Sequence, residues 1–74
     1  MKLAQVRRSW LMSTRELEAQ AKVSRKTIMD IEKGRVTPSL STIRKLSEAL
    51  QVAPMDVDEF RDVIMGKELA PANA

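Results

Sequence analysis

The side chains best suited to chemistry in this chain stand on one short segment. Arg25 and Lys26 are adjacent, and Met29 follows one helical turn later. At 100° per residue, a helix would place these three opposite the apolar pair Ile28 and Ile31. Two cations in the first turn of a helix oppose its dipole, at about 0.3–1 kcal/mol each. Arginine and lysine can instead donate hydrogen bonds to the O6 and N7 atoms of guanine. The segment therefore indicates a surface that reads nucleic acid.

Other interpretations of the same face stay open. The cations could form a solvated helix surface with no ligand. Asp30 could accept a hydrogen bond from cytosine, or it could form a salt bridge with Lys26 or Lys33. Met29 could touch a thymine methyl group or simply fill space.

Composition narrows the function classes. The 74-residue chain holds no cysteine and no histidine, which removes disulfides and the commonest metal ligand and general base. We therefore expect one small domain with no metal, no cofactor and no catalytic site. The acidic cluster near the C-terminus is explained as a solvated helix start: Asp56, Asp58, Glu59 and Asp62.

The charge distribution indicates a basic N-terminal part, and the hydropathy indicates a cytoplasmic protein. Residues 1–45 carry 11 basic and 4 acidic side chains, net +7, whereas residues 46–74 carry 2 and 6, net −4. This asymmetry favours a polyanionic partner such as double-stranded DNA. The chain begins at Met1 without a long apolar run, so we expect no membrane span.

The elements that must position this surface are helices. Sparse proline and glycine, and the absence of β-branched alternation, predict an all-α fold, a compact bundle of five helices. Their expected positions are about 2–10, after Ser13, from Ser24 to Lys33 with Gly34 just past the end, after Ser39, and from Pro54 or Asp56 to before Gly66. Residues 1–66 are expected to form the domain, and residues 67–74 a flexible tail.

The second and third helices form a helix-turn-helix. Only Lys22 and Val23 separate them before the Ser24 cap, so they must cross at a steep angle. We expect Val23 to plug the turn, and the helix at 24–33 to lie in the major groove. Its small shared core would consist of Leu17, Ala21, Val23, Ile28 and Ile31.

Two opposite charges occupy inward faces of different helices. Arg7 lies between Val6 and Trp10 on the first helix, and Glu32 lies beside Ile28 on the third. An unpaired buried charge is expensive, whereas a hydrogen-bonded pair is tolerable. We therefore expect a partly buried Arg7–Glu32 ion pair; alternatively, both side chains extend outward to water.

The residues of these helices resemble those of the phage repressor and Cro-type helix-turn-helix proteins, also called the XRE family. The stretch from Ser13 to Gly34 carries its core signature, above all Val-Ser-Arg-x-Thr-Ile-x-x-Ile-Glu-x-Gly. Its continuation runs from Pro38 to Leu50, and the resemblance covers about Leu3 to Phe60.

The resemblance implies a lambda-repressor-like DNA-binding domain and an ion pair at Arg7 and Glu32. It implies base-reading roles for Arg25, Lys26 and Met29, with Thr27 and Asp30 as lesser candidates. Phosphate contacts are expected from Thr14, Arg15, Ser24, Lys33, Arg35 and Thr37.

Several residues depart from the family pattern. Leu11 and Lys22 stand where glycine is frequent. If those positions need a left-handed backbone, each costs roughly 1 kcal/mol; alternatively, the helix ends differ locally. Glu18 replaces a frequent alanine near the helix crossing, and Thr14 a frequent glutamine.

These observations predict a sequence-specific transcriptional regulator, first a repressor binding a two-fold operator as a homodimer. The predicted dimer surface is the last helix, through Val57, Phe60, Ile64 and Met65, although this stripe could instead cover the monomer's own core, above all at Phe60. An alternative function is the antitoxin of a toxin–antitoxin pair, with a toxin partner. A third is a pure protein-interaction module.

Overall fold

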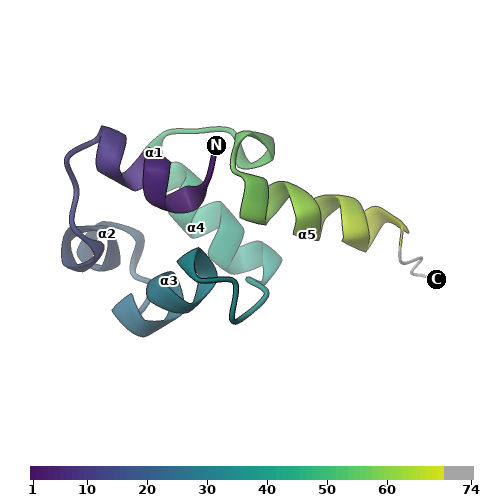
Figure 1. The fold of residues 1–74 in the computed structure, drawn as a ribbon, viewed down its shortest axis with the longest axis horizontal. Helices are drawn as coiled ribbons and strands as arrows, with labels where there is room; N and C mark the ends of the chain where they lie inside the picture. Colours follow the sequence, from purple (N-terminus) through teal and green to yellow (C-terminus); the bar gives the residue numbers. More distant parts are fainter. Residues whose placement is uncertain (70–74) are drawn as a thin grey trace.

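The helices begin and end close to the positions that the sequence indicates. The computed structural model describes the backbone of residues 1–69 and the side chains of residues 1–66. It contains α1 (Leu3–Ser9), α2 (Thr14–Ala21), α3 (Arg25–Glu32), α4 (Leu40–Leu50), a 3-10 turn η1 (Pro54–Asp56) and α5 (Asp58–Leu69). Figure 1 shows α1 to α4 gathered in one body, from which α5 extends. The all-α prediction is confirmed, since residues 1–69 hold five α-helices and no strand.

Serine side chains fix the starts of three helices. Each serine hydroxyl accepts a hydrogen bond from the backbone N–H three residues later, which satisfies a donor that has no partner inside the helix. At Ser13 the arrangement is reciprocal, because the Glu16 carboxylate accepts from the Ser13 N–H at 2.8 Å. The three cap pairs are Ser13 with Glu16, Ser24 with Thr27, and Ser39 with Thr42.

The helix expected at about 2–10 agrees with α1 to within one residue at each end. Trp10 lies just beyond α1, and its indole N–H donates to the Leu50 carbonyl at 2.9 Å, at the end of α4. One predicted boundary is wrong. Gly66 does not end the last helix, since α5 continues to Leu69. The tail expected at 67–74 is therefore helical in its first three residues, and the remainder, 70–74, lies outside the described residues.

The core joins α1 and the helix-turn-helix to the start of α5. It contains all five apolar residues predicted for the helix-turn-helix. It also contains Val57 and Phe60, each 0% exposed. The prediction that Val57 and Phe60 form a dimer surface is thus wrong, because their side chains are needed to close the monomer's own core. Ile64 is half-buried and Met65 is 44% exposed, so both keep free surface.

Within residues 1–69, three residues other than glycine adopt a left-handed backbone. Leu11 has φ 55°, Lys22 has φ 58° and Gln51 has φ 56°. Of the two possibilities left open at Leu11 and Lys22, the structure has the left-handed backbone, and Gln51 adds a third case, at the end of α4. The Cβ of an L-residue crowds its own carbonyl in this region, at about 1–2 kcal/mol.

A Leu11→Gly variant is expected to be more stable than the wild type by about 1 kcal/mol, because glycine tolerates φ 55° and the Leu11 side chain is 91% exposed. The matched control is Ala19→Gly, at an exposed helical position of α2, which should lose a similar amount. Urea denaturation measures both. Equal losses in the two variants would show that residue 11 is not strained.

The N-terminus is fastened to the start of α5. The Met1 ammonium donates to the Asp56 carbonyl at 2.9 Å and to Asp58 Oδ1 at 3.1 Å. Close by, the Leu3 N–H donates to Glu59 Oε1 at 2.8 Å. The hydrogen bond from the Met1 ammonium lowers the pKa of Asp58 below its ordinary value of 3.8, and the charge of Arg61 acts in the same direction.

An Asp58→Asn variant should therefore lose part of the acid sensitivity of folding. A carboxyl whose pKa is lower in the folded state stabilises the fold above its unfolded pKa, and this contribution disappears as the pH falls through the folded pKa. We expect the difference in stability between wild type and variant to be largest well above the ordinary pKa of 3.8, and to shrink as the pH falls below it through the lowered pKa of the folded state. Thermal melts across the acid range test this. Asp62→Asn, on the same helix, is the control, and an unchanged difference at every pH would contradict the expectation.

Candidate nucleic-acid interface

Helices α2 and α3 cross steeply through a tight turn. Figure 1 shows α2 nearly end-on while α3 lies across the view. The left-handed residue Lys22 ends α2, and the next residue, Val23, is only 7% exposed, so it plugs the turn. Ser24 then caps α3. This geometry matches the predicted helix-turn-helix and fixes α3 against the body.

Helix α3 has two contrasting faces. Ile28 and Ile31 are 0% and 1% exposed, respectively, and anchor the helix. Arg25, Lys26 and Met29 are exposed on the outer side. The Lys26 side chain is 87% exposed. The face expected to read bases is therefore free surface.

A shallow hollow of about 470 Å³ brings most of the predicted contact residues together. It lies along α3, at the edge facing α2 and the loop that follows α3. Four of its lining residues are cations, and Ser24, in the turn between α2 and α3, also lines it. The hollow is lined by Glu18, Ser24, Arg25, Lys26, Met29, Asp30, Lys33 and Arg35.

Asp30 is engaged by cations on both sides. Its Oδ2 accepts from Lys26 Nζ at 2.9 Å, and its Oδ1 lies 4.0 Å from Arg35 NH1. The Arg35 N–H also donates to the Asp30 carbonyl at 2.8 Å. The sequence left Lys26 and Lys33 open as salt-bridge partners of Asp30. In the structure Asp30 pairs with Lys26, and its second partner is Arg35, not Lys33.

The remaining predicted contacts lie outside this hollow. Thr27 is half-buried, and its hydroxyl oxygen accepts a hydrogen bond from Ser24 at 2.8 Å, so both hydroxyls serve the cap. Thr14 is half-buried at the first position of α2. Arg15 and Thr37 are exposed, on α2 and on the loop before α4.

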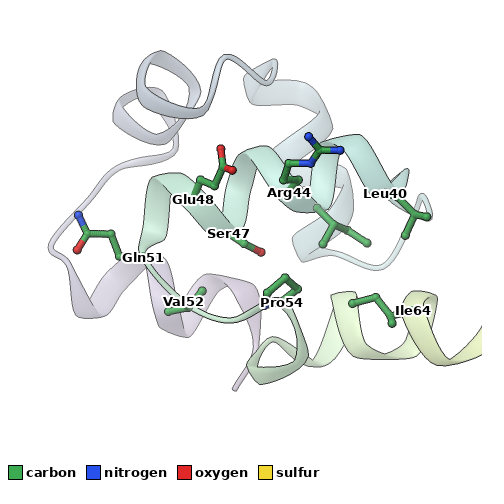
Figure 2. Close-up of a pocket in the computed structure, with 9 residues that line it drawn as sticks. Leu40, Arg44, Ser47, Glu48, Gln51, Val52, Pro54 and Ile64 are labelled. Atoms are coloured by element: carbon green, nitrogen blue, oxygen red, sulfur yellow. The ribbon is translucent and has the colours of Figure 1, made fainter.

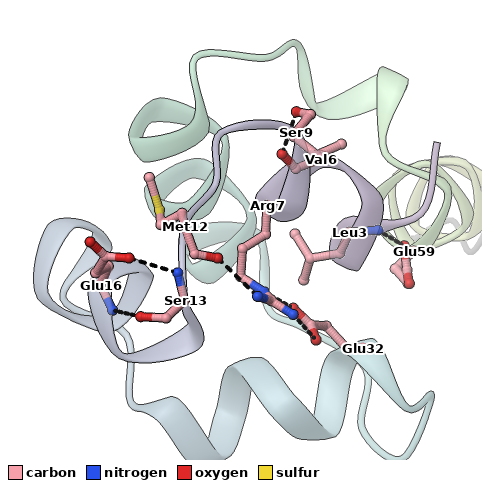
Figure 3. Close-up of polar contacts among 9 residues, drawn as sticks. All are labelled: Leu3, Val6, Arg7, Ser9, Met12, Ser13, Glu16, Glu32 and Glu59. Atoms are coloured by element: carbon pink, nitrogen blue, oxygen red, sulfur yellow. Dashed lines mark hydrogen bonds and ion pairs between the residues drawn. The ribbon is translucent and has the colours of Figure 1, made fainter.

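The ion pair that holds α3 to α1 is shown in Figure 3. Arg7 Nε lies 2.8 Å from Glu32 Oε2, and Arg7 NH2 lies 3.2 Å from Glu32 Oε1, a bidentate arrangement. The guanidinium also donates to the Met12 carbonyl at 2.9 Å, which ties down the chain between α1 and α2. The two side chains are only 11% and 12% exposed. They are paired and inward, not extended to water.

Sequence reasoning missed one residue of this surface. The sequence indicates Glu18 only as the replacement of a frequent alanine near the helix crossing, whereas in the structure it is half-buried and lines the hollow together with the cations. A helical wheel of α2 alone does not reveal this, because the hollow is formed by two helices that cross.

Other kinds of site find little support in the described part of the chain. Residues 1–69 contain no group of three or more acidic, histidine or cysteine side chains arranged to hold a metal ion. None of the described helices is both long and apolar enough to cross a membrane.

Comparison with known proteins addresses the family. A helix-turn-helix family model matches residues 3–57, most of the chain and all of the surface described above. No curated protein and no solved structure matches. The matched family consists of DNA-binding regulators and is not typically enzymatic. The steep α2–α3 crossing, the cationic outer face of α3 and this match agree, and the chain belongs to the Cro-type helix-turn-helix family, the XRE family of DNA-binding regulators.

Proposed function

We propose that this protein is a transcriptional repressor that places α3 in the major groove of a two-fold operator. Residues 1–66 would form the DNA-binding domain. The observation that carries the proposal is the outer face of α3, where Arg25 and Met29 are exposed beside Lys26 while Ile28 and Ile31 hold the helix from behind. Helix-turn-helix proteins of this geometry read base edges with the N-terminal part of the second helix.

The proposed contacts divide into two classes. Arg25, Lys26 and Met29 would touch base edges, with Thr27 and Asp30 at the margin. The phosphate backbone would be held by side chains and N–H groups around the hollow and on the neighbouring loop, which add affinity without sequence preference. That set is Thr14, Arg15, Ser24, Lys33, Arg35 and Thr37.

Selection of bound sites from random DNA tests this function. The expected result is one short consensus, repeated as an inverted pair with centres about one helical turn apart. Affinity should fall steeply with salt, with a log–log slope near −0.9 for each phosphate contacted. Recovery of sites without any consensus would contradict sequence-specific regulation.

Homodimerisation would use the side of the molecule formed by α4 and α5. A groove of about 510 Å³ separates these helices, with Leu40 and Ile64 on opposite walls (Figure 2). Leu40 is 52% exposed, and the buried Ser47 hydroxyl that lines the groove has no hydrogen-bond partner among the described residues. We propose that α5 of a second copy covers this groove. Exposed Arg44 on α4 and exposed Asp62 on α5 have opposite charges, which favours this pairing between copies.

An Ile64→Glu variant tests the dimer, because it places a charge on the groove wall. Ile64 also packs against the core, so a thermal melt first establishes that the variant is folded. Sedimentation is expected to show a monomer, and binding to a full operator should weaken while a single half-site is bound as before. Leu11→Gln, an exposed apolar-to-polar change outside the groove lining, is the control. A monomeric wild type, or a dimeric variant, would contradict the proposed surface.

The antitoxin alternative predicts a different occupant for the same side of the molecule. Purification from the native host should then yield a stoichiometric second protein, encoded next to this chain, in place of a homodimer. Recovery of the chain alone favours the repressor.

A further inference from the structure

One carboxylate, that of Asp30, lies among the cations that are proposed to contact DNA. The Asp30 side chain is 15% exposed, whereas its partners Lys26 and Arg35 are 87% and 66% exposed. The two cations thus reach from solvent to a carboxylate anchored in the helix. They come from opposite sides, one from the first turn of α3 and the other from the loop after it.

This arrangement limits the positive charge available to phosphate. Sequence-independent affinity depends on how many cations replace the counterions of DNA. A lysine that donates at 2.9 Å to a carboxylate must give up that contact before it can move to a phosphate. Asp30 therefore opposes binding to arbitrary DNA more strongly than one negative charge elsewhere on the surface would.

The same carboxylate discriminates between base edges. An ionised carboxylate only accepts hydrogen bonds. In the major groove, cytosine N4 and adenine N6 donate, whereas guanine O6 and N7 and thymine O4 accept. Acceptors facing Asp30 in a desolvated interface would repel its carboxylate oxygens, which is the repulsive element that specificity commonly needs.

We propose that Asp30 is a specificity-determining and positioning residue. It restrains Lys26 and Arg35, suppresses binding to arbitrary DNA, and favours sites that present an amino group of cytosine or adenine beside the middle of α3. This inference rests on the proposed function, since it requires α3 to be the reading helix.

An Asp30→Asn variant tests the proposal, because the amide keeps the shape of the side chain and loses the charge. Binding is measured against a site selected by the wild type and against duplexes of scrambled sequence. We expect affinity for scrambled DNA to rise about tenfold at low salt, with a log–log salt slope steeper by about 0.9–1.8 as one or two cations are freed. The ratio of specific to scrambled affinity should fall about tenfold.

Two variants separate this role from a general effect of charge. Glu18→Gln removes a carboxylate that lines the same hollow but makes no ion pair within the described residues, and Asp62→Asn removes one on α5. Both should change affinity less than Asp30→Asn and leave the selected consensus intact. In a Lys26→Met background, Asp30→Asn should steepen the salt slope by less than it does in the wild type.

The inference is overturned if Asp30→Asn matches Glu18→Gln in affinity, salt slope and consensus. That result is distinguishable from failure of the proposed function, which would appear as a wild-type consensus unaffected by Arg25→Ala. Thermal melts of each variant identify any loss of affinity that comes from unfolding.

Discussion

An Arg25→Ala variant is expected to lose most of its sequence preference while its fold becomes slightly more stable. Arg25 is exposed in the first turn of α3, where its charge opposes the helix dipole, so its removal should stabilise the domain by roughly 0.3–1 kcal/mol. A guanidinium that contacts guanine bidentately contributes about 1–3 kcal/mol of discrimination, which corresponds to a loss of about 5- to 150-fold in specific affinity. A variant that gains stability but loses specific affinity identifies a residue that contacts DNA, whereas a loss of both would identify a structural residue.

The measurement pairs a thermal melt with titrations of selected and scrambled DNA. Arg61→Ala is the matched control, because Arg61 is a half-exposed arginine on α5 that pairs only with Asp58 within the described residues. It should leave the consensus unchanged. If the Arg25→Ala, Lys26→Ala double variant bound its site with unaltered preference, α3 would not be the reading helix.

The second large effect concerns the ion pair between Arg7 and Glu32, which connects α1 to α3. Glu32→Ala is expected to destabilise the fold by about 3 kcal/mol, because the Arg7 guanidinium would remain largely buried without its carboxylate. A domain of 74 residues has a total stability of only about 4–11 kcal/mol. The expected fall in the midpoint of thermal unfolding is about 15 °C.

A double-mutant cycle identifies the cause. In an Arg7→Met, Glu32→Met variant no charge is stranded, so much of the lost stability should return. Recovery should stay incomplete, since Met12 would lose the donor to its carbonyl. Additive losses from the two single substitutions would mean that the contact between Arg7 and Glu32 contributes nothing. Binding by the folded fraction should remain specific, because neither residue lies on the outer face of α3.

Local signals in the chain determined much of this protein. Serine three residues before a free amide is a short-range interaction, so Ser13, Ser24 and Ser39 define helix starts without tertiary help. The 3.6-residue period likewise separates Ile28 and Ile31 from Arg25 and Met29. The inward positions of Arg7 and Glu32 could be predicted because a buried charge requires a partner. The resemblance added the family, which the match over residues 3–57 supports.

Only the tertiary structure decided which apolar and charged side chains on a helix face remain exposed and free to contact a partner. Val57 and Phe60 share a stripe with Ile64, but packing against the body covers the first two and leaves part of the third free. Nothing in the periodicity shows where one helix leaves the body. The sequence offered Lys26 as a partner of Asp30, but Arg35 could not be predicted, because it arrives through the path of a loop. Glu18 enters the hollow only through the crossing of α2 and α3. The start of α3 and the division between its two faces were thus determined locally, while the electrostatic surroundings of its outer face depend on contacts between elements.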